Sequence, residues 1–160
     1  MPHITIEYVI MIPLLLMQIF VFPMTAGWLM NIWVDSRRSL ALQDAASHLG
    51  STIQQLYYTL NHTTVSTVSA TYSPGLPPFI EDYHYVGNAT LRSISETALG
   101  SSKILQIRLV LKGTTIAVTT SVILGHNAQW KSSTFVSNST SAVISAQKFL
   151  NGTVLMRFGE

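Results

Sequence analysis

The feature that most constrains this chain is an uncharged apolar run near its N-terminus. No Asp, Glu, Lys or Arg occurs in residues 8–34, a run of 27 positions. About 20 apolar residues are enough for a helix to cross a hydrocarbon core of about 30 Å. Trp28 and Trp33, near the far end, suit a membrane interface. The run therefore predicts a helix that is inserted in a membrane at some stage.

The composition favours association over a freely soluble state. Apolar residues make up 48% of the chain and charged residues 10%, whereas soluble domains carry about a quarter charged residues. The net charge of +2 is small and scattered, which argues against nucleic acid as a partner. The chain has no cysteine, so disulfides and thiolate metal sites are excluded.

A second apolar pattern follows the run and has a helical period. Its residues recur at spacings of four and three: Leu42, Ala46, Leu49, Ile53, Leu56 and Leu60. We call these six residues the seam; the spacing predicts that one helix face packs against other helices or a sheet. The chain is expected to form one helix over residues 6–60, or two helices broken near Asp35 and Ser36. Pro13 and Pro23 predict kinks within the run.

The last hundred residues carry β signals. Residues 103–124 predict a hairpin with its turn at Lys112 and Gly113. Residues 142–150 and 153–158 predict a second hairpin, joined by Asn151 and Gly152 as a two-residue turn.

Residues 64–72 predict another strand, and the proline-rich residues 73–78 a loop. The expected fold is α+β: a helix over residues 1–60, then a small antiparallel β-sandwich or barrel-like domain of about six to eight strands over residues 61–160.

Four sequons of the N-x-[ST] type lie in the β-rich region, at Asn61, Asn88, Asn138 and Asn151. Residues 61–160 hold five Asn and 27 Ser or Thr, so chance predicts about one or two matches. N-glycans would place this region outside the cell. Arg37 and Arg38, which follow the apolar run, would instead place the β-rich region in the cytoplasm. Two arginines are the weaker signal, and we expect the β-rich region to be extracellular.

The N-terminus resembles a known family. The string from His3 to Tyr8, HITIEY, followed by a long apolar run, resembles the start of archaeal type IV pilins and archaellins, in which a glutamate is the fifth mature residue. The stretch IEYVIMIPLLL, with Pro13 six residues after Glu7, also resembles TadE-like pseudopilins. The resemblance covers roughly residues 3–50 and does not extend to the β-rich region.

The resemblance implies roles for two residues. In the family a peptidase removes a short leader, and the glutamate meets the N-terminal amine of a neighbouring subunit. Carried over, Glu7 is the assembly residue and His3 the first mature residue; the leader would be Met1 and Pro2, without a basic residue. The alternative for Glu7 is a carboxylate that stabilises the positive end of the helix dipole.

No catalytic motif is present. The sequence contains no nucleophile elbow, phosphate loop, zinc-ligand spacing or EF-hand loop. We expect a protein that is not an enzyme and holds no metal or cofactor. Tyr83, His84 and Tyr85 beside Glu81 and Asp82 fit an exposed strand edge or a subunit contact better than a metal or sugar site.

The expected function is mechanical. The chain would be the structural subunit of an extracellular, archaeal type IV-like filament. It would be inserted in the membrane before assembly, then form a helical homo-oligomer with apolar helices in the core and glycosylated β domains outside, for adhesion or surface contact. The alternatives are a membrane-anchored TadE-like minor pilin or assembly factor, and a membrane-tethered surface-binding module.

Overall fold

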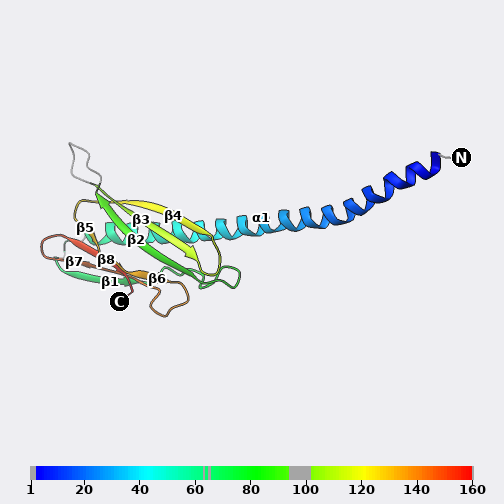
Figure 1. Cartoon of the computed structure of the whole chain (residues 1–160). Helices are drawn as coiled ribbons and strands as arrows, with labels where there is room; N and C mark the ends of the chain where they lie inside the picture. The colour runs from blue at the N-terminus through cyan, green and yellow to red at the C-terminus, as the bar shows by residue number, and fades with distance from the viewer. Residues whose placement is uncertain (1–2, 63, 65, 94–101, 160) are drawn as a thin grey trace. The chain divides into compact units, whose positions relative to one another are not determined.

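A computed structural model describes residues 3–62, 64, 66–93 and 102–159, with side chains from residue 9 onward. Residues 3–62 form one α-helix, α1 (His3–His62), which continues through Pro13 and Pro23 (Figure 1). The expectation of one helix is therefore confirmed, and the break near Asp35 and Ser36 does not occur.

The chain divides into two compact units, Met1–Arg37 and Arg38–Glu160. The boundary expected from sequence was residue 60, at the end of the helix. The structure divides α1 itself, because the helix from Arg38 onward buries its apolar face against the strands while the earlier residues do not.

Within the residues that the structure describes, eight strands follow the helix and form two sheets (Figure 1). One sheet has the order β1-β7-β8-β5 and the other β4-β3-β2-β6. The strands are β1 (Val68–Tyr72), β2 (Tyr85–Ser93), β3 (Lys103–Leu111), β4 (Ala117–Leu124), β5 (Ala128–Trp130), β6 (Thr134–Val136), β7 (Ile144–Lys148) and β8 (Val154–Phe158). All pairings are antiparallel except β5 with β8. The α+β fold is confirmed, and its sheets form a sandwich and do not close into a barrel.

Both expected hairpins are present, as β3–β4 and β7–β8. The second turn is one residue longer than expected. The amide of Phe149 donates to the Thr153 carbonyl and that of Gly152 to the Phe149 carbonyl, both at 2.9 Å. Gly152 has φ +78°, so the loop has three residues and ends in a left-handed glycine, a common hairpin type.

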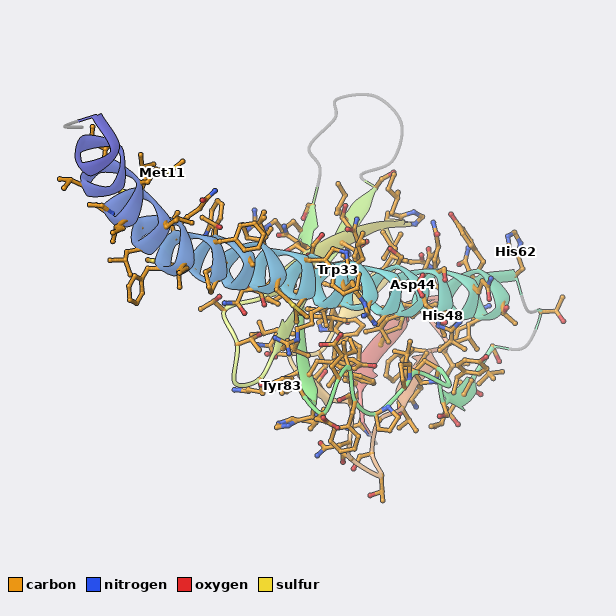
Figure 2. The ribbon with its side chains drawn as sticks, turned by 90° about the vertical axis from the view of Figure 1, so that its right-hand side faces the viewer. Met11, Trp33, Asp44, His48, His62 and Tyr83 are labelled. Carbon is orange, nitrogen blue, oxygen red and sulfur yellow. The ribbon has the colours of Figure 1, made fainter. Side chains whose placement is uncertain are left out.

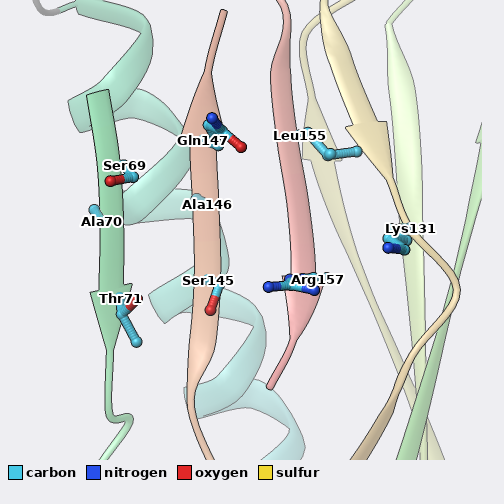
Figure 3. Close-up of a pocket in the computed structure, with 9 residues that line it drawn as sticks. All are labelled: Ser69, Ala70, Thr71, Lys131, Ser145, Ala146, Gln147, Leu155 and Arg157. Carbon is cyan, nitrogen blue, oxygen red and sulfur yellow. The ribbon is translucent and has the colours of Figure 1, made fainter. Parts of the chain in front are cut away.

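The core of Arg38–Glu160 lies between the two sheets and the second half of α1. Five of the six seam residues are at most 2% exposed: Leu42, Ala46, Leu49, Ile53 and Leu60. A Cβ atom on Gly50 would lie 3.0 Å from Val122 of β4, so the helix approaches this sheet closely. On the other side, the Lys148 ammonium of β7 donates to the Asn61 carbonyl at 3.5 Å, and the helix lies behind β1 and β7 in Figure 3.

Aromatic rings join the two sheets away from the helix. Phe158 of β8 packs edge-on against Phe135 of β6, with ring centroids 5.5 Å apart, and against Trp130 of β5 at 4.8 Å. Phe135 in turn stacks on Tyr85 of β2 at 6.3 Å. Such pairs add about 0.5–1.5 kcal/mol each beyond the area they bury.

Candidate functional site

The largest candidate site is the surface of α1 within Met1–Arg37. Every large apolar side chain of this segment from Val9 to Trp33 is about half exposed or more; Met11 is 62% and Trp33 59% exposed. Both project outward from the helix in Figure 2. The segment is long and apolar enough to cross a membrane. A helix of this length that is apolar on all sides is typical of a membrane span or of the core of a large protein.

One polar side chain inside the segment, that of Thr25, is satisfied locally. The Thr25 hydroxyl lies 3.0 Å from the carbonyl oxygens of both Val21 and Phe22. Hydrogen bonding of a threonine to the preceding helical turn hides the hydroxyl from an apolar environment. The segment can therefore enter lipid or a helix bundle without a cost from this group.

The two residues that the resemblance assigns to assembly lie at the start of α1. The backbone of His3 and of Glu7 is helical, and their side chains are outside the described residues. Their roles therefore stay predictions.

The seam lies inside Arg38–Glu160 and is not exposed. Its residues contact the two sheets of the same chain, and only Leu56 is partly exposed. The opposite helix face carries the exposed polar residues Gln43, Ser47 and Gln55 together with exposed Leu40 and Tyr58. Asp44 and His48 are labelled on this part of α1 in Figure 2. Of the two partners that the spacing allowed, sheets and helices, the structure places sheets on the seam.

Arg37 and Arg38 have different surroundings. The Arg37 guanidinium lies 5.0 Å from the ring centroid of Trp33 within the first unit. In the second unit, Arg38 Nε donates to Glu81 Oε2 at 2.7 Å. The Arg38 guanidinium also lies 5.1 Å from the Tyr83 ring centroid. Arg38 thus fastens the helix to the turn before β2.

That turn is conformationally unusual. Glu81 has φ 44° and Asp82 φ 67°, a region that side chains other than glycine seldom occupy. Two backbone hydrogen bonds between Ile80 and Tyr83, of 2.9 and 3.1 Å, close the turn. The ion pair to Arg38 stabilises a geometry that the two residues alone would disfavour. Sequence reasoning missed this contact because its partners are 43 positions apart and no local pattern links them.

Tyr85 does not lie at an exposed strand edge, and that expectation is wrong for this residue. Its side chain is 0% exposed, and its hydroxyl donates to the Pro77 carbonyl at 2.8 Å. Burial raises the pKa of Tyr85 to about 12. Burial also raises the pKa of Tyr57, against a smaller lowering by a backbone hydrogen bond at Gly125. Both tyrosines are neutral structural groups.

The four sequon asparagines are all exposed, as an N-glycan requires. Asn61 lies near the end of α1, and its Oδ1 accepts from Asn127 Nδ2 at 2.8 Å. Asn88 lies within β2, with Arg108 and Thr134 as cross-strand neighbours.

The remaining two sequons lie in turns. Asn138 follows β6, and Asn151 lies in the β7–β8 loop. Asn151 Oδ1 accepts from the amide of Thr153 at 3.0 Å. This bond links the first and third residues of the sequon in an Asx turn, a local stabilisation of the loop.

The described residues contain no group of three or more His, Cys, Asp or Glu side chains that would hold a metal ion. Glu81 and Asp82 form the turn before β2. Tyr83 packs between Arg38 and the β3–β4 turn, and its ring lies 3.2 Å from where a Cβ atom on Gly113 would be. This region supports packing and does not form a ligand cage.

Comparison with known proteins gives no family, curated relative or solved structure that matches this chain.

Proposed function

We propose that this protein is the structural subunit of an extracellular filament of the type IV kind. The single observation that carries the proposal is the contrast between the two units. The buried core residues of the described part of the chain lie between Leu42 and Phe158, so Arg38–Glu160 has a core of its own. Among the described side chains, none from Val9 to Trp33 is part of that core, which supports a partner from another chain.

Sibling helices are the partner that fits best. Burial of each large apolar side chain contributes about 1.5–3 kcal/mol, and this segment offers more than a dozen. A bundle of identical helices would make association in water effectively irreversible. The same helix suits storage in the membrane before assembly. The β-sandwich, joined to the helix by its own core, would then form the outer layer, for adhesion or surface contact.

Sheared surface filaments test the proposal directly. A filament subunit should be abundant in the sheared fraction by mass spectrometry and should form fibres in electron micrographs. A minor pilin would appear there in trace amounts. A chain found only in the membrane fraction would be a tethered binding module, and the filament proposal would fail.

Glu7→Ala tests the assembly residue. A carboxylate at the edge of an apolar bundle is costly unless a cation pairs with it, and the N-terminal amine of a neighbour is the proposed cation. The variant should enter membranes normally but give few fibres, measured as the ratio of sheared to membrane-bound protein. Glu7→Asp, which keeps the charge, is the matched control. Normal fibre yield from Glu7→Ala would remove this role.

A further inference from the structure

Charge is unevenly distributed over the fold. The eight strands contain five Lys or Arg residues and no Asp or Glu. The acidic residues whose side chains the structure describes are Asp35, Asp44, Glu81 and Asp82, all in α1 or the turn before β2; Glu96 and Glu160 lie outside the described residues. The strand faces therefore carry cations and neutral polar groups.

A hollow of about 490 Å³ lies on the outer face of the β1-β7-β8-β5 sheet, shown in Figure 3. Its volume falls within the range of small-ligand sites, roughly 300–1,000 Å³. No residue that lines it is acidic or aromatic. Among the described residues, neither Arg157 nor Lys131 has an ion-pair partner in this hollow.

The strand register sets the polar groups in rows. Thr71 of β1 pairs with Ser145 of β7, which pairs with Arg157 of β8. Lys131 continues this row, because its amide donates to the carbonyl of Met156, the neighbour of Arg157, at 2.9 Å. With strands about 4.8 Å apart, the row spans roughly 14 Å. It places two hydroxyls and two cations along a line that crosses the strands.

A second row lies beside the first. It contains Ser69 of β1 and Gln147 of β7, which pair with each other. The Ser145 hydroxyl of the first row donates to the Gly159 carbonyl at 2.5 Å, so its oxygen is left to accept from a ligand hydroxyl. The two rows together offer donors and acceptors for hydroxyl groups and cations for regularly spaced anions.

We propose that this hollow binds a linear acidic polysaccharide, with uronate carboxylates on Arg157 and Lys131 and sugar hydroxyls on the Ser, Thr and Gln side chains. Guanidinium matches a carboxylate in a bidentate geometry. Single-stranded nucleic acid binds through aromatic stacking platforms, which the hollow lacks. The proposal deepens the adhesive role proposed above, on which its extracellular setting rests.

The outer face of the β4-β3-β2-β6 sheet provides a comparison within the same chain. It carries a hollow of about 520 Å³ whose lining includes Arg108 as its one cation. That hollow also contains Asn88 and Thr90, the first and third residues of a sequon. A glycan on Asn88 would occupy it, whereas no sequon residue lines the hollow with Arg157. The hollow lined by Arg157 and Lys131 is therefore the one left open for a foreign polysaccharide.

The test uses the full chain in detergent micelles and immobilised polygalacturonate. Arg157→Gln with Lys131→Gln should weaken binding on the order of tenfold, since it removes both cations that would pair with the uronate carboxylates. Arg92→Gln with Arg108→Gln, on the other sheet, removes the same charge and should change binding less than about twofold. Unchanged thermal melting of both double variants establishes that they fold.

Neutral dextran and duplex DNA serve as competing ligands. Weak binding of dextran and of DNA, together with a loss confined to the Arg157 and Lys131 variant, supports the proposal. Equal losses in the two double variants, preference for DNA, or no binding of the unaltered chain would overturn it. Because the assay uses dispersed chains, its failure is separate from a failure to form filaments, which the sheared fraction measures.

Discussion

Individual residues in this protein serve mainly to hold segments together. Arg38 makes an ion pair with Glu81 and packs on the Tyr83 ring. These contacts join α1 to the turn before β2. A contact of this kind fixes where the helix enters the sandwich.

The Arg38–Glu81 pair should be measurable as a coupling. Arg38→Gln and Glu81→Gln are each expected to lower the free energy of unfolding by about 1 kcal/mol, because the side chains are only partly shielded from solvent. The double variant should lose less than the sum of the two. Urea unfolding in micelles measures all three, with exposed Arg108→Gln as a control expected to change stability by under about 0.5 kcal/mol. Strict additivity would show that the pair contributes nothing.

Tyr85 predicts how stability depends on pH. Its pKa in the folded protein is about 12, above the ordinary value of 10. A raised pKa means that the folded state favours the neutral phenol. The contribution of Tyr85 to the free energy of unfolding is therefore complete below about pH 10 and is lost as the pH rises toward 12. The urea midpoint should therefore fall over this interval.

Tyr85→Phe separates this effect from general alkaline unfolding. The variant loses the hydrogen bond to Pro77 and should be about 1 kcal/mol less stable at pH 8. The deficit should narrow as pH rises above 10, because phenylalanine does not ionise. Tyr72→Phe, at a half-exposed position, should keep the profile of the unaltered chain. A constant deficit across the whole range would contradict the assignment to Tyr85.

At the scale of elements, α1 has two different surfaces along its length. Before Arg38 its apolar side chains are exposed, and after it the seam is buried between two sheets of the same chain. The part of α1 from Arg38 onward thus contributes to the core of the sandwich. Substitutions in the two halves should have different consequences.

Ile53→Ala should destabilise the sandwich itself. Ile53 is 0% exposed, and truncation of a buried isoleucine to alanine costs about 2–5 kcal/mol. Ser47→Ala, on the exposed face of the same helix, should be nearly neutral, so thermal melting of the pair isolates the buried face. Loss of fibres in an Ile53 variant would report this misfolding and would not by itself identify a subunit contact. Equal melting temperatures for the two variants would contradict the packing.

Local sequence patterns predicted which helices, strands and turns form better than they predicted which of these elements pack against each other. The spacing of Leu42 to Leu60 predicted a helix face, and Lys112 and Gly113 a turn, because both depend on neighbouring residues. The pairing of β5 with β8 is parallel and has no local signal. The Glu81–Asp82 turn lacks the glycine that marks left-handed geometry, since its stabilisation comes from Arg38. The seam was recognised, but periodicity alone does not distinguish sheets from sibling helices as its partner.

At the scale of the whole molecule, the two units have different requirements. Arg38–Glu160 contains the buried core residues among those that the structure describes, and Met1–Arg37 contains the exposed apolar side chains from Val9 to Trp33. The apolar residues are therefore enriched in the first unit, whereas charged residues are scarce in both units. The second unit carries the polar strand faces and all four sequons.

Removal of residues 1–37 tests this division. A chain of residues 38–160 should fold, remain monomeric without detergent and melt cooperatively, because it keeps the seam, both sheets and the Arg38–Glu81 pair. The full chain should require detergent or assemble. Size-exclusion chromatography with light scattering measures the mass of each, and far-ultraviolet circular dichroism should show retained helix and strand. The same truncation carrying Ile53→Asp is the control: a buried unpaired charge should unfold it. A truncated chain that aggregates as readily as the full chain would show that association resides in the sandwich, and the apolar helix would then lose its place as the source of assembly.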